Sequence, residues 1–388
     1  MSRDLSRISL RQFFASLFNR AGSQREIELD QYRIRFFHWQ ADENGFKEWR
    51  LEGVEPGLQG SLKLSPEAEK GEDGVLSGEM ISPVLETGFE LHSAIASWNV
   101  DSPPGSWVKI SLRVQFEGIW SRWYILGIWS QSGDPDERHS VNGQDDERIK
   151  IATDTLVVRE GLNSHALQMK INLNSRSDSQ SPVVTAAALV ADNRFRSNYI
   201  PSKGNRQLWN KIIEVPQFSQ MVYPGGGNVW CSPTSVSMLL AYWQNYKGLP
   251  EPLVRETVAG VYDAIYEGAG NWSFNTAYAA TRGMNSAVSR LASLEEAEEF
   301  IARGIPLAMS LSWKPGELTG APVEKSNGHL VVLAGFDALG NPVVNDPAAK
   351  EDSLVRRVYQ RQEFEKLWRT TSGGVVYIIT PPGITWPE

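Results

Sequence analysis

Cysteine and histidine are scarce in this chain of 388 residues, which contains one cysteine and five histidines. The lone cysteine, Cys231, excludes a disulfide bond within the chain, and no cluster of cysteine and histidine has the spacing of zinc ligands. No cofactor or metal is therefore expected. Long apolar runs are also missing: no stretch could span a membrane, and no signal peptide is visible near the N-terminus. The sequence leaves the compartment open, with the cytoplasm as the default expectation.

Runs of basic residues are absent, and the formal net charge is −8 at pH 7. An acidic chain without a Lys/Arg cluster is a poor match for a nucleic-acid-binding protein. Hydrophobic residues make up 41% of the chain, which is enough for packed cores and argues against extended disorder. The length exceeds what one hydrophobic core usually serves, so two domains are predicted.

Residues 1–25 are predicted to form a separate N-terminal segment. Apolar residues within 8–18 fit a short amphipathic helix. We expect this helix to dock on its own protein, because too few basic residues accompany it to favour a membrane surface.

Residues 26–200 are predicted to form an all-β domain, an antiparallel β-sandwich. Apolar and polar residues alternate along three segments, 32–36, 108–116 and 167–173. Alternation with a period of two indicates strands that have one buried face. Clusters of turn residues separate these strands, as is typical of a sandwich. The polar, acidic segment 130–148 is predicted to be a long surface loop.

Tryptophans concentrate in this first half, at Trp39, Trp49, Trp98, Trp107, Trp120, Trp123 and Trp129. Most of them are expected in the core, because large aromatic side chains are usually buried. Trp120 and Trp123, on either side of Arg122, are the best candidates for an exposed aromatic site. Such a site could bind a glycan or a cell-wall polymer, because the faces of indole rings stack on sugar rings.

Cys231 stands where a reactive thiolate could form. Apolar residues within 236–243 recur at helical spacing, and Pro233 suits the first turn of that helix. A thiol at a helix N-terminus meets free N–H groups and the positive end of the helix dipole, both of which favour the thiolate. On position alone, a buried structural cysteine is the equal alternative.

His329 is the one histidine in the same half of the chain as Cys231. It precedes an apolar run, 330–336, that is typical of a buried strand, and a second run that begins at Val343 leads to Asp346. If the two runs pair as a hairpin, His329 and Asp346 lie roughly opposite each other, within hydrogen-bonding reach. A thiol, a base and an acid that orients the base are the parts of a nucleophilic triad.

Several motifs of the second half resemble the C39-like peptidases, papain-like cysteine hydrolases related to the leader-peptidase domains of bacteriocin exporters. The resemblance covers roughly residues 210–388 and rests on the motifs at 215–220, 230–233, 270–279, 304–306, 328–332 and 345–347. It implies an α+β papain-like domain, which we place at residues 201–388, and a bacterial origin. A polar, glycine-containing stretch at 201–205 is predicted to link this domain to the β-sandwich.

The resemblance also assigns catalytic roles. Cys231 would be the nucleophile, and His329 the general base and acid. Asp346 would orient His329. Gln220 would donate a hydrogen bond to the oxyanion, with Gln217 as the fallback donor.

Two features depart from the family pattern. The family usually has Cys-Gly-Pro where this chain has Cys231, Ser232 and Pro233, and the added side chain could narrow the acyl site. A glycine-rich stretch, 224–227, lengthens the segment between Gln220 and the cysteine. This insertion could restore the oxyanion geometry or leave Gln220 out of reach.

The predicted function is hydrolysis of a peptide or amide by a Cys–His–Asp triad, with a peptide or protein as substrate. Two alternatives are open. The chain could be a binding protein, in which the β-sandwich holds a glycan or protein and the papain-like half is an inactive scaffold. It could also be an acyl transferase of the same chemistry, in which an amine replaces water as the acceptor.

Overall fold

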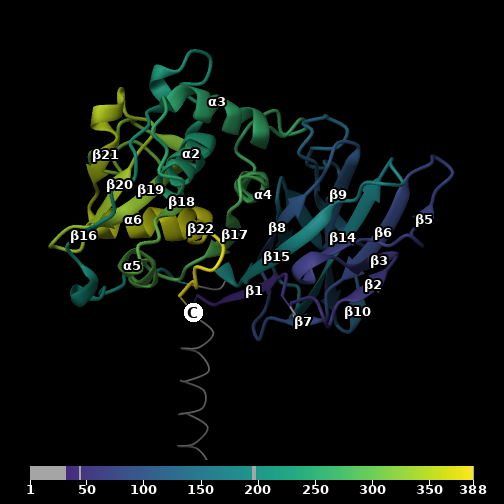
Figure 1. The fold of residues 1–388 in the computed structure, drawn as a ribbon. Coiled ribbons are helices and arrows are strands. Elements are labelled where there is room, and N and C mark those ends of the chain that lie inside the picture. The colour runs from purple at the N-terminus through teal and green to yellow at the C-terminus, as the bar shows by residue number, and fades with distance from the viewer. Residues whose placement is uncertain (1–31, 43–44, 195–197, 388) are drawn as a thin grey trace, which may run out of the picture.

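The computed structural model describes residues 32–42, 45–194 and 198–387, so the predicted N-terminal segment 1–25 lies outside the described residues. An all-β region occupies the first half of the chain, and an α+β region the second half, beside it (Figure 1). The prediction of an all-β and an α+β half is confirmed. In the described part of the chain, no helix is long and apolar enough to cross a membrane.

Two antiparallel sheets form the all-β region. Sheet A contains β1 (Ile34–Gln40), β3 (Val54–Pro56), β4 (Leu62–Leu64), β8 (Ser93–Asp101), β12 (Ile149–Ala152), β13 (Thr155–Val158) and β15 (Val183–Asp192). Sheet B contains β2 (Arg50–Glu52), β5 (Glu69–Lys70), β6 (Leu76–Ile81), β7 (Leu85–Glu86), β9 (Ser106–Phe116), β10 (Ile119–Trp120), β11 (Tyr124–Trp129) and β14 (Ala166–Ser175).

The predicted alternation is clear in β9, which pairs with β14 along almost its whole length. Val108, Ile110 and Leu112 are fully buried, whereas Lys109 and Arg113 lie on the other face of the strand and are only partly buried. Successive side chains of a strand point to opposite faces, so this pattern places one face of sheet B on the core and the other toward water.

Fewer tryptophans of the β region are buried than the sequence predicts, because Trp39 and Trp107 are also partly exposed. Trp49, Trp98 and Trp129 are buried in the core. Trp120 and Trp123 are partly exposed. The first group serves packing, and the second leaves aromatic surface at the outer face of sheet B.

Sheet C is the centre of the α+β region. Its strands are β16 (Lys211–Ile212), β17 (Asn285–Arg290), β18 (Leu307–Trp313), β19 (Ser326–Phe336), β20 (Pro342–Asn345), β21 (Arg356–Val358) and β22 (Val375–Thr380). The helices are α2 (Cys231–Trp243), α3 (Pro250–Val261), α4 (Trp272–Thr281), α5 (Leu294–Ala302) and α6 (Arg361–Leu367), the last of which continues into a π-helical turn, Trp368–Ser372. Single 3-10 turns lie at Leu58–Gly60, Arg206–Leu208, Gln220–Val222 and Asp352–Leu354.

Helix α2 is buried on all sides rather than on the one face that the sequence predicts. Residues 232–241 are all buried, because α2 packs against β19 of sheet C and against α3 and α4. Its small hydroxyl side chains bond within the core: Ser237 donates to the carbonyl of Pro233 over 2.8 Å, and Ser235 to that of Leu330 over 3.2 Å. These hydrogen bonds satisfy the buried hydroxyl groups of Ser235 and Ser237, whereas that of Thr234 has no partner among the described residues.

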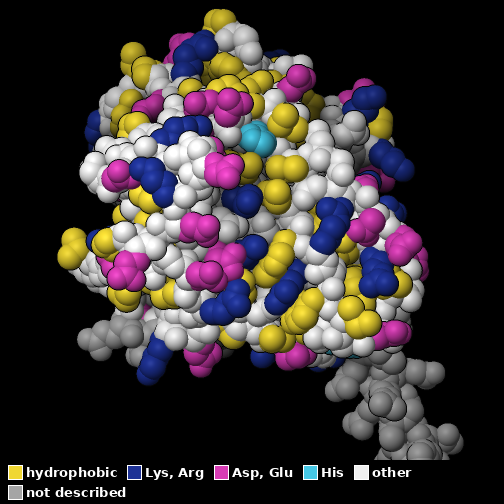
Figure 2. Space-filling model, turned by 90° about the vertical axis from the view of Figure 1, so that its right-hand side faces the viewer, with side chains coloured by type: hydrophobic (Ala, Val, Ile, Leu, Met, Phe, Trp, Pro, Cys, Tyr) yellow, Lys and Arg dark blue, Asp and Glu magenta, His cyan; other side chains and the backbone are white. Residues whose placement is uncertain are grey.

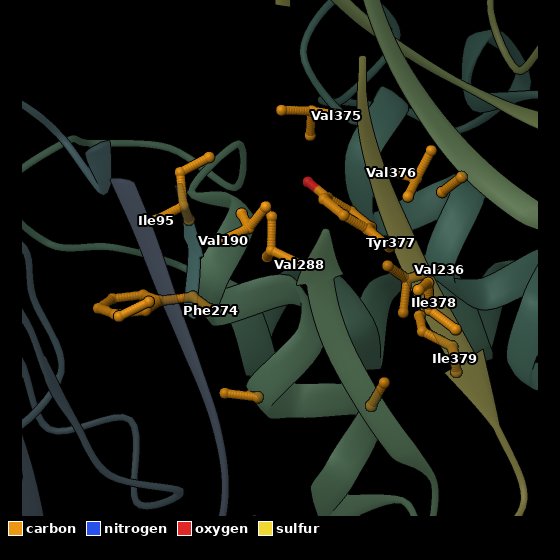
Figure 3. Packing of buried hydrophobic residues seen from close by; sticks show 14 of the residues in the cluster. Ile95, Val190, Val236, Phe274, Val288, Val375, Val376, Tyr377, Ile378 and Ile379 are labelled. Carbon is orange, nitrogen blue, oxygen red and sulfur yellow. The ribbon is translucent and has the colours of Figure 1, made fainter. Parts of the chain in front are cut away.

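The two regions share one buried core. Strand β8 is buried over nearly all of its length and packs against α4 and β17 of the α+β region. Figure 3 shows Ile95 of β8 and Val190 of β15 close to Val288 of β17, so that apolar side chains run from sheet A into the second half. The contact has the character of a domain interior rather than of a loose interface.

Phe274 of α4 lies at the centre of an aromatic cluster at this contact. It is fully buried, with its ring centroid 6.1 Å from that of Trp98 and 5.2 Å from that of Trp129. A Cβ atom at Gly127 would lie 2.9 Å from the Phe274 ring, so only glycine leaves room for the aromatic ring there. The two halves thus interlock around Phe274.

The segment 130–148 has no regular strand, as predicted, but part of it is buried against the α+β region. Arg138 donates three hydrogen bonds of 2.7 to 3.1 Å to backbone carbonyl groups at and just past the end of α3. Ser140 donates both its N–H and its hydroxyl to Asp263, over 2.9 and 3.1 Å. The segment therefore joins the two halves.

The predicted linker 201–205 is also fastened to the α+β region. The N–H of Ser202 donates to Glu365 over 3.0 Å, and the N–H of Asn205 to Glu298 over 2.5 Å. We retain residue 200 as the proposed boundary between the two domains. Because of the shared core, we expect the domains to fold together rather than separately.

Candidate active site

Cys231 opens helix α2 and is partly exposed. Burial raises the pKa of its thiol, but the hydrogen bond and charge of His329, with the backbone N–H groups of Leu330 and Ser232, lower that pKa by more. The net direction is therefore below the ordinary value for cysteine. His329 makes the largest contribution to this lowering, and the N–H of Ser232, at the start of α2, adds the smaller effect expected of a helix N-terminus.

His329 lies on β19, and Asp346 lies just past the end of β20. Nε2 of His329 is 2.7 Å from Oδ1 of Asp346, and both side chains are buried. The two strands pair as an antiparallel hairpin with Val332 opposite Asn345. His329 and Asp346 therefore meet diagonally across the hairpin, within the hydrogen-bonding reach that the sequence suggested.

The charges of this pair stabilise each other. Burial lowers the pKa of His329, but the charge and hydrogen bond of Asp346, followed by those of Cys231, raise it to about 10. Because Nε2 of His329 faces Asp346, Nδ1 is the nitrogen left for Cys231. A lowered thiol pKa beside a raised imidazole pKa favours a thiolate–imidazolium pair at neutral pH.

Two further donors hold Asp346. The hydroxyl of Tyr359 donates to Oδ2 over 2.7 Å, and the N–H of Ala348 donates to Oδ1 over 2.9 Å. Burial raises the pKa of Asp346, but His329 and then Tyr359 lower it by more. The sequence analysis missed Tyr359, because this tyrosine reaches Asp346 only through the pairing of β21 with β20.

Asn345 faces away from His329. Its Nδ2 donates to the carbonyl groups of Val215 and Pro216, over 3.1 and 3.0 Å, and its Oδ1 accepts a hydrogen bond from Arg356. Asn345 therefore fastens β20 to the segment before Gln220, while the next residue along the chain points to the histidine.

Gln220 is buried beside the glycine-rich insertion. Its Nε2 donates to the carbonyl of Gly227 over 3.0 Å, and its backbone N–H donates to Pro347 over 2.9 Å. Its buried Oε1 has no hydrogen-bond partner among the described residues. The fallback candidate, Gln217, accepts a hydrogen bond from the N–H of Arg356 and so has a structural role.

The insertion itself is fastened in place. The indole of Trp230 lies against Gly226, where a Cβ atom would overlap the ring. The guanidinium of Arg255 lies 5.4 Å from the Trp230 ring and donates to the carbonyl of Pro224 over 3.1 Å. The loop therefore has a defined position between Gln220 and Cys231. In the part of the chain that is described, no group of three or more His, Cys, Asp or Glu side chains is arranged to hold a metal ion.

Ser232, the residue that departs from the family pattern, turns away from the thiol. It is buried, and its hydroxyl lies 2.9 Å from the hydroxyl of Tyr377 on β22. The added side chain therefore occupies the core and does not narrow the space around the sulfur.

We expect Ser232→Ala to lower stability without changing thiol chemistry. The substitution leaves the buried hydroxyl of Tyr377 without this partner, which should cost about 1–3 kcal/mol in the free energy of unfolding. Urea denaturation measures that cost, and iodoacetamide alkylation measures the reactivity of Cys231. A large change in alkylation rate with unchanged stability would show that Ser232 acts on the thiol instead.

Family models match both halves of the chain. A model described as the peptidase C39 N-terminal domain matches residues 36–192, and a model described as the peptidase C39 like family matches residues 212–376. A search of curated proteins finds no match.

Two solved structures show only weak likeness. TmCBM61 in complex with β-1,4-galactotriose is 11% identical, covers 39% of this chain and 97% of its own, and has a TM-score of 0.21. A family two carbohydrate esterase from Cellvibrio japonicus is 9% identical, covers 54% of this chain and 49% of its own, and has a TM-score of 0.17. The match to the peptidase C39 like family confirms the resemblance predicted for residues 210–388. The match to the peptidase C39 N-terminal domain adds a resemblance in the all-β half that the sequence analysis did not predict.

Proposed function

We propose that this chain is a cysteine peptidase or amidase with a papain-like catalytic domain. One observation carries the proposal: a thiol at a helix N-terminus lies beside a histidine that is hydrogen-bonded, at 2.7 Å, to a buried carboxylate. A nucleophile, a base and a residue that orients the base are the minimum for covalent acyl transfer. The match to the peptidase C39 like family supports the same chemistry.

The proposed reaction has two steps. The Cys231 thiolate attacks the carbonyl carbon of the scissile amide, and the imidazolium of His329 gives its proton to the leaving amine as the C–N bond breaks. The acyl group is then a thioester on the sulfur. His329, now neutral, takes a proton from water, the hydroxide attacks the thioester, and the acid product leaves with the thiolate restored.

Gln220 is the proposed oxyanion donor, together with the backbone N–H of Cys231. One amide N–H of Gln220 is held by the carbonyl of Gly227, which orients the side chain and leaves the second N–H for the substrate oxygen. The glycine-rich insertion would then support the oxyanion site rather than displace it. One such donor contributes about 3 kcal/mol to transition-state stabilisation in comparable enzymes.

The pH dependence of Cys231 alkylation tests the proposed ion pair. Because the thiol pKa is lowered, iodoacetamide should react at its full rate well below pH 8.5, about where an ordinary cysteine is half ionised. Because His329 holds its proton up to a pKa of about 10, turnover should fall as the pH rises through that value. Mass spectrometry of the Cys231 peptide measures the alkylation rate from pH 4 to 10.

His329→Ala is the control for this profile. It removes the charge that lowers the thiol pKa but leaves the burial that raises it, so the profile should move toward or above pH 8.5. An unshifted profile in the variant would show that His329 does not lower the thiol pKa. An ordinary profile in the wild-type chain would contradict an activated thiol and favour an inactive scaffold.

The two rival functions stay open and are distinguishable. A binding protein with an inactive papain-like half would show no thiol activation. An acyl transferase would show it, but would transfer the acyl group to an added amine, such as hydroxylamine or glycine amide, in preference to water. Product analysis by mass spectrometry with and without the amine separates the hydrolase from the transferase.

The proposed partners are a peptide or protein at the cysteine site and a glycan or cell-wall polymer at the β region. The partly exposed pair Trp120 and Trp123 supports the second partner, because it leaves indole surface on the outer face of sheet B.

A further inference from the structure

A cleft of about 440 Å³ lies on the outer face of sheet B, among side chains from β2, β6, β9 and β14. Sheet A, through β8 and β15, carries the contact with the α+β region, so the cleft opens on the far side of the β region from Cys231. Figure 2 views the molecule from the side of the β region and shows Lys and Arg side chains gathered near the middle of that face, among acidic ones. The cleft is polar and charged, unlike a packing surface, because Glu48, Arg50, Glu79, Arg113 and Lys170 line it.

Arg113 is the central cation of this cleft. Its guanidinium carbon lies 4.5 Å from the ring centroid of Trp120 and 4.6 Å from that of Trp123. The sequence placed Arg122 with these two tryptophans, but Arg122 lies over the ring of Tyr124 instead. Strand β9 brings Arg113 to the indoles, which no local sequence pattern shows.

A buried amide holds Arg113 in place. Nε and Nη2 of Arg113 donate to Oε1 of Gln168 over 3.0 and 2.5 Å. Gln168 is 9% exposed, and its own Nε2 donates to the carbonyl of Ser82 over 2.8 Å. The guanidinium is thus positioned before any ligand arrives, which lowers the entropic cost of binding.

Arg113 has no carboxylate partner among the described residues. Two of its five N–H groups donate to Gln168, and the remaining three have no acceptor in the described part of the chain. The other cations are engaged: Arg50 and Lys170 both lie near Glu79, at 2.9 and 3.4 Å. Arg113 therefore has a positive charge that no carboxylate neutralises and three N–H groups that a ligand could use.

We propose that this cleft binds an anionic glycan, whose carboxylate accepts hydrogen bonds from Arg113. A planar guanidinium with free N–H groups matches a carboxylate, which accepts two parallel hydrogen bonds. Trp123 also lines the cleft, with Arg113 and Lys170 at 4.6 and 4.8 Å from its ring centroid, and Glu79 can accept hydrogen bonds from sugar hydroxyl groups. A few placed polar groups beside an aromatic ring are typical of small-ligand sites.

The position of the cleft favours a glycan over a peptide. The cleft lies over the paired strands β9 and β14, each of which has a neighbouring strand on both sides. A peptide that extends a sheet needs an unpaired strand edge, and this face offers none. A sugar needs only side-chain groups, which the face supplies.

Titration calorimetry on the full-length chain at low ionic strength tests this site. We expect a hexamer of galacturonic acid to bind, and its methyl ester to bind at least about tenfold more weakly, because the ester lacks the charge that Arg113 recognises. Arg113→Met should weaken binding of the acid by a similar factor or more. The matched control, Lys63→Met, removes a cation of sheet A that is paired with Glu55 and should leave binding unchanged.

Each other outcome overturns part of the proposal. Equal affinity for the acid and its ester, or for the wild-type chain and Arg113→Met, would exclude the carboxylate contact. Tighter binding of a glutamate hexamer would exclude a glycan as the ligand class, and binding of no probe would exclude the site. If Arg113→Met lowers the melting temperature, Arg113→Lys replaces it, since a lysine keeps the charge but loses the forked donors.

This site is independent of the proposed hydrolysis. The sugar probes contain no amide bond, and the cleft lies away from Cys231. The calorimetric result therefore stands whether or not the chain cleaves a peptide.

Discussion

Replacing Cys231 with alanine should abolish hydrolysis of any peptide that the wild-type chain cleaves, a loss of roughly 10⁵-fold or more in kcat. The acyl intermediate needs a nucleophile next to His329. The neighbouring hydroxyl, that of Ser232, lies in the core against Tyr377 and cannot take over. Cleavage of a peptide library, followed by mass spectrometry, measures the loss. Circular dichroism and the melting temperature show whether the variant is folded.

Variants of the other site residues should differ in how much hydrolytic activity they lose, in a predictable order. His329→Ala should be nearly as severe as the loss of the thiol, because it removes both the base and the acid. Asp346→Ala should leave more activity, because this residue only orients the histidine. Gln220→Ala should cost about 10²–10³ in rate and leave alkylation almost unchanged. Unchanged turnover in Asp346→Ala, together with a large loss of turnover in Asn345→Ala, would contradict the assignment of Asp346 as the acid that orients His329.

Phe274→Ala should lower the free energy of unfolding of the whole chain by about 3–5 kcal/mol. The substitution leaves a cavity between the two halves, where Trp98, Trp129 and Gly127 surround the ring. Because that cavity belongs to both regions, the wild-type chain should unfold in one transition and the variant should unfold earlier, also in one transition. Urea denaturation followed by tryptophan fluorescence and by far-ultraviolet circular dichroism tests this.

Leu58→Ala is the control for this prediction. Leu58 is 88% exposed, so its truncation should change stability by no more than about 0.5 kcal/mol. Two separate transitions in the wild-type chain, with only one of them shifted by Phe274→Ala, would show that the halves fold independently. The expectation of joint folding would then be wrong.

The faces of the long strands could be predicted from the sequence, but the contact between the halves could not. In β9, charged and apolar residues alternate, so the period of two identifies the buried face. In β8, small residues such as Ser97 and Ala96 stand among the large ones, and both faces are buried. A pattern without alternation does not show which element covers the second face.

The proposed catalytic residues could be predicted from the sequence, but the residues that hold them in place could not. A single cysteine, one histidine in the same half and an acid after the next apolar run were enough to bring Cys231, His329 and Asp346 together. Tyr359 and Gly227, which hold Asp346 and Gln220, could not be found in this way. They act through strand pairing and a backbone carbonyl, and neither leaves a pattern in the sequence.

The most direct test of the central claim is to look for an acyl group on Cys231. The full-length chain is mixed with a cleaved peptide, quenched in acid within milliseconds to seconds, digested and analysed by mass spectrometry. We predict that the Cys231 peptide gains the mass of the acyl part of the substrate as a thioester that hydroxylamine removes, and that His329→Ala forms little of it. Continued cleavage with an unmodified Cys231, or an acyl group on another residue, would contradict the proposed mechanism.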